Sequence, residues 1–352
     1  MIWLVLGALF LAGGTLRADS SLYVSLAGDK RIAHYGIDPA SGMLRVKGST
    51  PLKGEPGALV MSPDGRILFA AVRSEGKLAS FSVDPAKGSL TPLSLVAAAA
   101  DPAFVATDRT GRFLLTAYYV AGQVSVHAIQ PNGALQAEAA QWVTTDDKAH
   151  GILVDATNQR ILVPHTGPNA IHRFGWDAAA GKLLAGMAPI EQAEETGPRH
   201  LVFHPGRQDR VYAINEQGGS VSVYAFDGKT GTMDELETVS TLPTAFKEKN
   251  ACADIEFTPD GRFLIASNRG HDSLTSFAVD EAGLLTLVGQ FPTEPTPRQF
   301  AIEPGGRFLY AAGQSSGKLA VFEILASGGL KRIGTVAVGE KPWWVLAAGG
   351  GE

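Results

Sequence analysis

The sequence contains a single cysteine, Cys252, and only 18% of its residues are charged. One cysteine excludes an intrachain disulfide and argues against a cysteine-based metal site, so we interpret Cys252 as a buried structural thiol. Lys and Arg total 30 against 35 Asp and Glu, which gives a net charge of −5 with no basic run. The chain therefore lacks the basic patch that nucleic-acid binding or membrane-surface binding would require.

Long apolar runs are absent after the N-terminus. Residues 2–12 form an apolar core of signal-peptide length, with Arg17 and Asp19 close behind it. We therefore predict a cleaved signal peptide at residues 1–18 and a mature domain at residues 19–352, located in the periplasm or secreted. After cleavage we expect no membrane association. The alternative interpretation is an uncleaved N-terminal anchor.

Glycine and proline, by contrast, are frequent. The 41 Gly, 20 Pro and 45% hydrophobic residues suit many short strands joined by tight turns and exclude disorder. One pattern recurs about every 46 residues: an apolar strand, a polar turn with glycine, a second apolar strand, then two looser strands. Copies of this unit begin at Pro56, Pro102, Ala149, Pro198, Ala253 and Pro297.

The turn inside each copy predicts a hairpin, because Asp-Gly and Gly-Gly pairs supply the positive φ that such turns need. The turn glycines are Gly65, Gly111, Gly206, Gly261 and Gly306. In the remaining copy Asn158 stands at the turn, and asparagine tolerates the same left-handed conformation.

Two strands at the ends of the chain lack partners within their own units. Residues 341–349 look like a first strand, and residues 20–28 look like a second strand. Pairing them would close a ring and hide both edges. Seven units of about 46 residues also account for nearly all of the 334 residues after residue 18 (352 minus 18). We predict an all-β, seven-bladed β-propeller with four-stranded antiparallel blades, closed by the N- and C-terminal strands. An insertion at residues 244–250 predicts a loop over one face.

The repeat allows equivalent positions of the blades to be compared. A purely structural repeat would carry similar small or apolar residues there, whereas charged and aromatic residues indicate a site grafted onto the frame. The heads of the first strands carry Gly57, Ala103, His150, Arg199, Asp254, Arg298 and Trp343. The ends of the second strands carry Arg73, Tyr119, Thr166, Glu216, Arg269 and Gln314.

These residue types suit acyl chemistry on an anionic substrate. Arginine binds carboxylate or phosphate and stabilises an oxyanion, and histidine moves a proton near neutral pH. Glu216, between Arg199 and Arg269, should stay ionised and could orient them or activate a water. Taken singly, each residue is better explained as a surface ion pair. No metal pair, P-loop, nucleophile elbow or dinucleotide motif occurs in its required context, so we predict no metal and no cofactor. Trp343 could stack on a sugar, although packing of the closing strand is the simpler role.

Several motifs resemble the lactonase family of seven-bladed propellers, which includes propeller-type 6-phosphogluconolactonases and fungal-type carboxymuconate cycloisomerases. They are GPRHLVFHP at residues 197–205, INE at 214–216, FTPDGRFLIASNRGHDSL at 257–274 and PRQFAIEPGGRFLYAAGQ at 297–314. The resemblance covers the chain after residue 18, and the signatures of WD40 propellers are absent.

The resemblance implies opening or closing of a lactone ring on a carboxylated or phosphorylated small molecule, without metal or cofactor. It places catalytic roles on His150, Arg199, Glu216 and Arg269. We add four predicted substrate-binding residues: Arg298, Tyr119, His165 and Asp254. The motif VPHTG departs from the family, which usually has an aspartate where this chain has His165.

Three functional hypotheses follow. The first is a metal-independent lactonase acting on a sugar-acid lactone, as a monomer. A carboxymuconate-type cycloisomerase would use the same arginines on another substrate. A non-catalytic extracytoplasmic scaffold would have no reason to gather these four residues. Because export separates the chain from cytosolic phosphogluconolactone, an unphosphorylated sugar lactone or an aromatic-derived lactone is also a candidate substrate.

Overall fold

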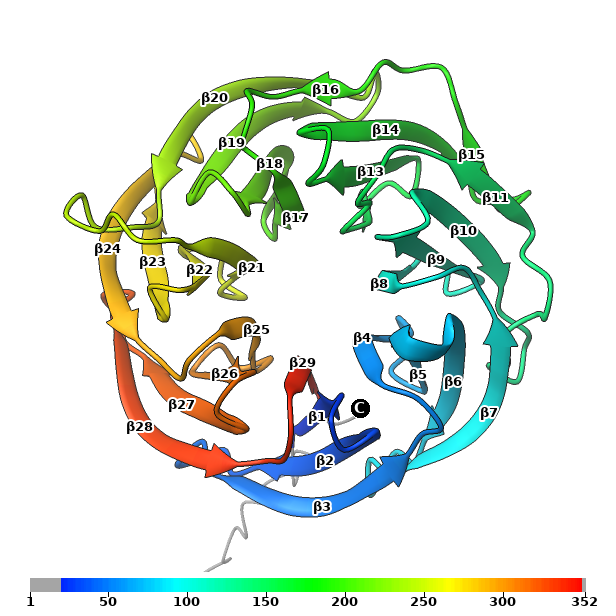
Figure 1. The fold of residues 1–352 in the computed structure, drawn as a ribbon, viewed down its shortest axis with the longest axis horizontal. Helices are drawn as coiled ribbons and strands as arrows, with labels where there is room; N and C mark the ends of the chain where they lie inside the picture. Colours follow the sequence, from blue (N-terminus) through cyan, green and yellow to red (C-terminus); the bar gives the residue numbers. More distant parts are fainter. Residues whose placement is uncertain (1–19, 350–352) are drawn as a thin grey trace, which may run out of the picture.

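Seven β-sheets stand as blades around a central channel (Figure 1). The computed structural model describes residues 20–349, so the predicted signal peptide lies outside the described residues. Six sheets have four strands, and one has a fifth short strand on its outer side. All pairings within the sheets are antiparallel, for example β1 with β2 and β4 with β5. The predicted seven-bladed propeller is confirmed.

We number the blades in chain order. Blade 1 holds β29 (Pro342–Ala348), β1 (Ser21–Leu26), β2 (Arg31–Ile37) and β3 (Leu44–Pro51). Blade 2 holds β4 (Pro56–Met61), β5 (Ile67–Val72), β6 (Lys77–Val83) and β7 (Leu90–Ala97). Blade 3 holds β8 (Pro102–Thr107), β9 (Phe113–Tyr118), β10 (Gln123–Ala128) and β11 (Gln141–Thr144). Blade 4 holds β12 (Leu153–Val154), β13 (Arg160–His165), β14 (Ala170–Asp177), β15 (Lys182–Leu184) and β16 (Ile190–Glu191).

Blade 5 holds β17 (Pro198–His204), β18 (Arg207–Asn215), β19 (Ser220–Asp227) and β20 (Thr232–Ser240). Blade 6 holds β21 (Ala251–Phe257), β22 (Phe263–Arg269), β23 (Ser273–Val279) and β24 (Leu285–Pro292). Blade 7 holds β25 (Pro297–Ile302), β26 (Phe308–Gly313), β27 (Lys318–Ile324) and β28 (Leu330–Ala337). The one helical segment in residues 20–349 is the 3₁₀ turn η1 (Arg73–Glu75), and no helix there is long and apolar enough to cross a membrane.

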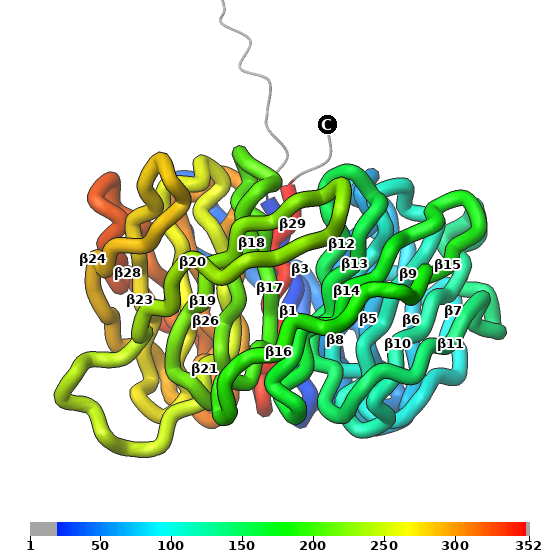
Figure 2. Tube along the Cα trace, turned by 90° about the horizontal axis from the view of Figure 1, so that it is seen from above, coloured from blue at the N-terminus to red at the C-terminus, as the bar shows by residue number. Residues whose placement is uncertain are grey.

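The ring closes as predicted, because the last strand pairs with the first. β29 lies antiparallel to β1, with Val24 opposite Val345 at the middle of the pair. β29 thereby becomes the innermost strand of blade 1, beside the channel (Figures 1 and 2). No edge of β1 is left open, and the two ends of the chain hold one blade together.

The hairpin turns follow the predicted chemistry in five of the six copies. Gly65, Gly111, Gly261 and Gly306 adopt φ of 71°, 69°, 73° and 75°, and Asn158 substitutes for glycine with φ of 56°. Gly206 differs, since it is not among the residues with positive φ. There the register shifts between Phe203 and His204, so blade 5 turns through a bulge instead.

The core lies between neighbouring blades rather than at one centre. One apolar cluster joins blades 1, 2 and 3, and another joins blades 1 and 7. A repeated contact fastens blade to blade: Tyr23, Tyr212 and Tyr310 each donate from the hydroxyl to a turn glycine of the following blade. The acceptors are the carbonyl oxygens of Gly88, Gly283 and Gly42, at 2.7, 2.7 and 2.8 Å. Burial of the ring adds about 1.5–3 kcal/mol to each such contact.

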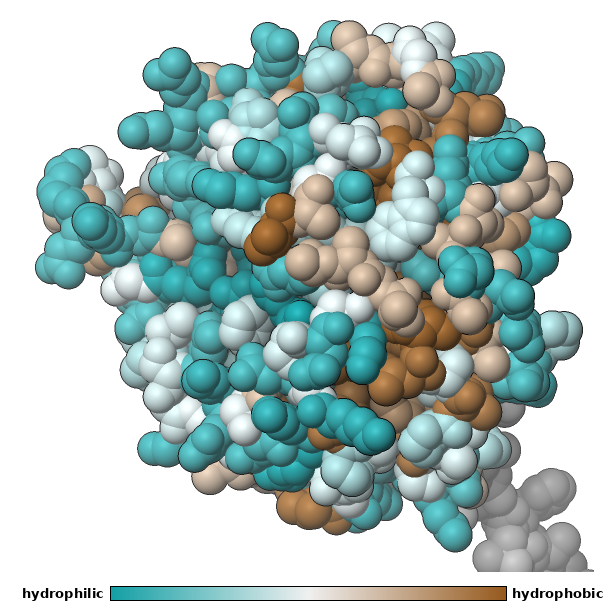
Figure 3. Space-filling view, turned by 45° about the vertical axis from the view of Figure 1, so that its right-hand side comes forward, coloured by the Kyte–Doolittle hydropathy of each residue, from teal (hydrophilic) through white to brown (hydrophobic). Residues whose placement is uncertain are grey.

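The insertion before β21 forms a loop without regular structure, as predicted. It projects outward from the rim of the ring, so the predicted placement over one face is wrong (Figures 1 and 2). In Figure 3 hydrophilic side chains dominate the left of the face, and most of the hydrophobic ones gather on its right. Several large exposed apolar residues, such as Val46 on β3 and Leu95 on β7, lie on the outermost strands.

Candidate active site

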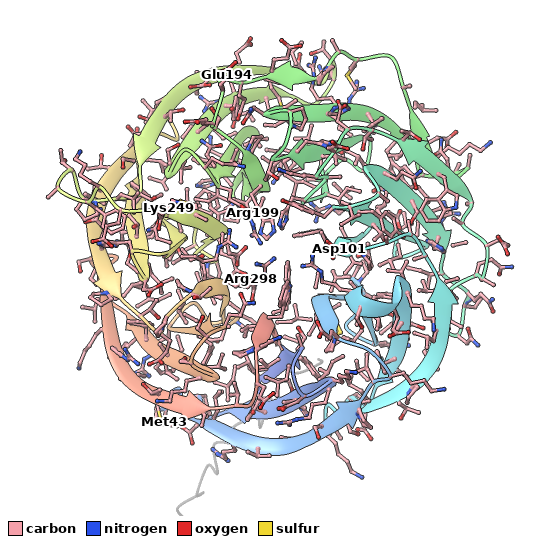
Figure 4. All side chains as sticks on the ribbon, viewed as in Figure 1. Met43, Asp101, Glu194, Arg199, Lys249 and Arg298 are labelled. Carbon is pink, nitrogen blue, oxygen red and sulfur yellow. The ribbon has the colours of Figure 1, made fainter. Side chains whose placement is uncertain are left out.

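The predicted site residues gather at one end of the channel, which we call the mouth. Each innermost strand starts at this end, and the second strand of each blade returns to it, because the two are antiparallel. Pro198 pairs with Asn215 and Pro297 with Gly313, so the next residues, Arg199 and Arg298, stand at equivalent places. Figure 4 shows both arginines pointing into the channel.

The register corrects one predicted position. In blade 6 Cys252 pairs with Asn268, so Cys252 takes the place of the proline in the other blades. Ala253 therefore stands at the head of β21, and Asp254 lies one residue deeper. The sequence comparison was wrong by one residue here because blade 6 has no proline to mark the start of its strand.

Glu216 lies between two arginines, as predicted. Its Oε2 atom is 3.0 Å from Arg199 Nε and 3.1 Å from Arg269 Nη2. Arg199 is 1% exposed, Glu216 21% and Arg269 15%. Arg269 also donates to the carbonyl oxygens of Ala251 and Cys252, which fixes its orientation. A pair held this way can bind an anion or a polarised carbonyl without moving.

His150 lies beside this cluster with an unused ring nitrogen. Its edge packs against Tyr119 at 5.4 Å and its ring against His200 at 5.3 Å. The Nδ1 atom is buried and has no hydrogen-bond partner. Burial, and then the charge of Arg199, hold the pKa of His150 well below its usual value. The imidazole is therefore neutral at physiological pH and can accept a proton when a negative charge forms nearby.

A second layer lies beneath the mouth and supports it. His200 Nδ1 is 2.8 Å from Asp254 Oδ1, and Asp254 Oδ2 accepts from the backbone of Phe300 in the next blade. Arg199 Nη1 lies 3.1 Å from Nε2 and 3.5 Å from Nδ1 of His200. Burial raises the pKa of Asp254 to about 7 and lowers that of His200. Asp254 is thus a supporting residue, 4% exposed, and not the substrate contact that we predicted.

Trp343 and Trp344, adjacent on β29, have different surroundings. Trp344 packs edge-on against Phe104 at 5.4 Å, as expected for a closing strand. Trp343 instead lies under two guanidinium groups, Arg298 at 3.9 Å and Arg73 at 4.6 Å from its ring centroid. The predicted binding residue Arg298 is therefore in the mouth, on an aromatic surface that sequence reasoning assigned to packing.

His165 does not belong to the mouth, which corrects another prediction. Its side chain is fully buried and packs against His172 of the neighbouring strand, with the rings tilted by 47° and their centroids 4.4 Å apart. Its Nδ1 atom lies 3.2 Å from the carbonyl oxygen of Asp147. It ends β13 and pairs with Ala170, so its side chain faces the blade. The following residue, Thr166, occupies the mouth position, with a buried hydroxyl that has no partner.

Sequence reasoning missed three residues of the site. His200 contacts Arg199, and Asp101 contacts Arg73. Arg73 itself was recognised only as the end of a strand. A signal existed for the first two, because each lies directly beside a recognised position: His200 follows Arg199, and Asp101 precedes Pro102. Within residues 20–349, no three His, Cys, Asp or Glu side chains gather in a way that could hold a metal ion.

The profile of a family described as "Lactonase, 7-bladed beta-propeller" matches residues 22–347. The chain belongs to this family. A 6-phosphogluconolactonase of Pectobacterium carotovorum is 33% identical over 326 residues, which cover 92% of this chain and 83% of that protein. A 6-phosphogluconolactonase of Erwinia tasmaniensis is 34% identical over 329 residues, covering 93% and 84%.

Solved structures agree with this membership. A periplasmic gluconolactonase of Pseudomonas aeruginosa superposes with a TM-score of 0.87 at 28% identity, over 94% of this chain and 99% of that one. The similarity extends over all seven blades, so it includes the strands that carry the mouth. These relatives confirm the predicted family and support the prediction of a sugar-lactone hydrolase.

Proposed function

We propose that the mouth is an active site that hydrolyses the lactone of a sugar acid. The observation that carries this is the grouping of Arg199, Glu216 and Arg269, with neutral His150 beside them. Relatives named for 6-phosphogluconolactone and gluconolactone hydrolysis support the same reaction. A scaffold would gain nothing from a buried arginine and an unpartnered imidazole at the same mouth.

In this mechanism Arg199 and Arg269 hold the lactone carbonyl and stabilise the oxyanion, and Glu216 keeps them in place. A water oxygen bonds to the carbonyl carbon and gives its proton to Nδ1 of His150. The bond from that carbon to the ring oxygen then breaks, and the same proton passes to the ring oxygen. The product is a hydroxy acid, whose own carboxyl proton goes to solvent.

The depressed pKa of His150 suits such a relay. A weakly basic imidazole gives up its proton readily, which the ring oxygen needs when it leaves as an alcohol. The positive charges near His150 oppose its protonation in the free protein, and the negative charge of the developing oxyanion compensates for them. The alternative, in which Glu216 takes the proton from water, is an outcome of the test below.

Export belongs to the proposal as well. The apolar segment at residues 2–12 supports a signal peptide, and the related gluconolactonase is described as periplasmic. We propose that the mature chain acts in the periplasm or outside the cell.

The test compares wild type with H150Q and E216Q in the hydrolysis of a sugar lactone across pH. We expect H150Q to lower kcat about 10²–10⁴-fold, the usual contribution of a positioned acid–base group. E216Q should lose less and keep the shape of the pH profile. If E216Q alone abolishes the dependence on pH, Glu216 is the base. Wild-type rates in H150Q would refute the relay.

A further inference from the structure

Beneath the mouth, three neighbouring blades carry buried polar side chains at a position where the other four blades do not. This position lies one residue below the strand head, and its polar occupants are His200, Asp254 and Gln299. The remaining blades carry apolar side chains or glycine there: Ala58, Phe104, Gly151 and Trp344. The frame therefore accepts apolar residues at this position. Burying polar groups there costs free energy that the fold alone does not explain.

Asp254 is held from both sides as an acceptor. Its Oδ1 atom lies 2.8 Å from His200 Nδ1, and its Oδ2 atom accepts from the backbone nitrogen of Phe300 at 3.3 Å. The backbone nitrogen of Asp254 itself donates to the Ser267 hydroxyl at 3.0 Å. Because both carboxyl oxygens face N–H groups, the ionised carboxylate satisfies this arrangement best.

The nitrogens of Arg199 indicate where His200 carries its proton. A guanidinium group has donors only. Arg199 Nη1 donates to the carbonyl oxygen of Ala253 and lies 3.1 Å from His200 Nε2, so Nε2 has to be the acceptor. A neutral imidazole then carries its proton on Nδ1, the atom beside Asp254. Arg199 Nε faces Glu216, and Nη2, which donates to no group in residues 20–349, is left for a substrate oxygen.

A proton on Asp254 would disturb this arrangement. Burial raises the pKa of Asp254 to about 7, and the charge of Arg199 acts in the opposite direction. Burial, and then Arg199, lower the pKa of His200, so its imidazole stays neutral. A protonated Asp254 donates to Nδ1, which moves the imidazole proton to Nε2 and turns it against Arg199 Nη1.

The groups around this pair are mostly cationic. Those that face it from the surrounding elements are Arg199 on β17, Arg269 on β22, Arg298 on β25, Glu256 on β21 itself, and His150, whose ring packs against His200. Glu256 is the one other carboxylate among them, and its Oε2 atom accepts from the backbone nitrogen of Ile302 at 3.0 Å. A test of Asp254 therefore has to separate it from Glu256.

We propose that His200 and Asp254 are positioning residues for Arg199. Ionised Asp254 fixes the Nδ1–H tautomer of His200, and the bare Nε2 holds Arg199 Nη1, so that Nη2 stays directed at the lactone carbonyl. The inference rests on the proposed function, because Arg199 has to act on that carbonyl for its orientation to affect the rate. Its consequence is a fall in kcat as Asp254 takes up a proton. The titration of His150 belongs to a lower pH, since its pKa lies well below its usual value.

The first experiment removes the ring nitrogens of His200 and keeps a ring. We expect H200F to lower kcat for a sugar lactone by about 10–100-fold, the range for a lost hydrogen bond to a charged group. KM should change little, because an oxyanion is stabilised in the transition state. H200Q places an amide oxygen near the position of Nε2 and should recover part of the loss. The matched control is H127F, because His127 is also buried and packs edge-on against Trp142 at 6.1 Å, but on β10. Equal kcat in H200F and H127F would overturn the inference.

The second experiment follows kcat against pH. Wild type should lose activity on the acid side with a midpoint near the pKa of Asp254, about 7. D254N cannot titrate, and its amide oxygen can accept from Nδ1–H of His200, so this loss should disappear. E256Q keeps an acceptor for Ile302 and should retain the wild-type profile. A profile that persists in D254N, or disappears in E256Q alone, would contradict the role of Asp254. This comparison also decides the matter if H200F does not fold.

A spectroscopic readout separates this inference from the proposed function. With ¹⁵N-labelled histidine, the His200 signals are identified by their absence in H200Q, and the nitrogen shifts distinguish the two tautomers. We expect the Nδ1–H tautomer well above the pKa of Asp254, and a change to Nε2–H below it in wild type but not in D254N. An Nε2–H tautomer at the higher pH would overturn the inference. If the tautomers behave as expected but no lactone is hydrolysed, the contact stands and the proposed reaction is wrong. If lactones are hydrolysed while H200F matches H127F, the reaction stands and the positioning role is wrong.

Discussion

Replacing Arg199 by methionine should separate catalysis from stability. The Arg199 guanidinium is 1% exposed, approaches Glu216 at 3.0 Å and donates to the carbonyl oxygen of Ala253. Methionine fills similar space without the charge. Loss of one oxyanion donor costs about 10²–10³ in kcat, or about 2.7–4 kcal/mol. We therefore expect kcat/KM for a sugar lactone to fall by at least about 100-fold.

Stability should change much less. R199M removes a buried cation, and Glu216 keeps Arg269 at 3.1 Å, so no buried charge is left alone. We expect the melting temperature to stay within about 4 °C of wild type, the shift that about 1 kcal/mol produces. The assay pairs acid release from the lactone with thermal unfolding, and R262M is the control. Activity within threefold of wild type, or a large drop in melting temperature that explains the loss, would refute the reasoning.

Three further predictions concern the frame. Because the pKa of Asp254 is about 7 in the folded chain against 3.8 ordinarily, wild type loses stability from this group as pH rises from about 4 to about 7. D254N has no such loss, so its free energy of unfolding in urea should rise relative to that of wild type over this pH range. A difference between the two proteins that does not change with pH would contradict a pKa of Asp254 raised by burial. At Gly42, with φ of 72°, a Cβ would lie 2.5 Å from the Phe308 ring, whereas Gly65, with φ of 71°, has open space. G42A should therefore lower the free energy of unfolding by about 1–3 kcal/mol more than G65A does, as measured with denaturant. Equal losses would show that the Phe308 ring moves aside. Deleting the chain from Pro342 onward removes β29 and leaves the edge of β1 open. We expect an insoluble product, and a soluble monomer with native circular dichroism would contradict the closure.

Much of the frame could be predicted because each unit carries its own signals. Turn residues with positive φ mark every hairpin but one, and Asn158 shows that the requirement is conformational rather than a matter of glycine alone. The closing pair of strands followed from two unpartnered apolar segments. Gly206 failed as a marker, since blade 5 uses a bulge that leaves no distinct pattern in the sequence.

Only those residues of the candidate site that occupy equivalent positions in the blades could be predicted from the sequence. The repeat aligns His150, Arg199, Glu216 and Arg269 at one mouth, where the structure has them, and their catalytic roles stay a prediction. The predicted position of Asp254 was wrong by one residue. A shift of one residue along β21 moves a side chain from the mouth to the layer beneath it.

The contacts between blades at the mouth left no pattern in the sequence. Trp343 meets Arg298 and Arg73 across three blades, and such distant contacts depend on side-chain packing. His165 was taken for a binding residue because it stands where relatives differ, yet the end of its strand faces His172. Burial, not position in the repeat, decides its role.

The most direct test of the central claim is the hydrolysis rate of the purified mature chain on a panel of lactones. The panel contains plain, phosphorylated and carboxylated sugar lactones and a muconate-type lactone. We predict hydrolysis of at least one sugar lactone well above the spontaneous rate, with that activity lost in R199M. Spontaneous rates on every sugar lactone, or turnover of the muconate-type lactone alone, would contradict the account.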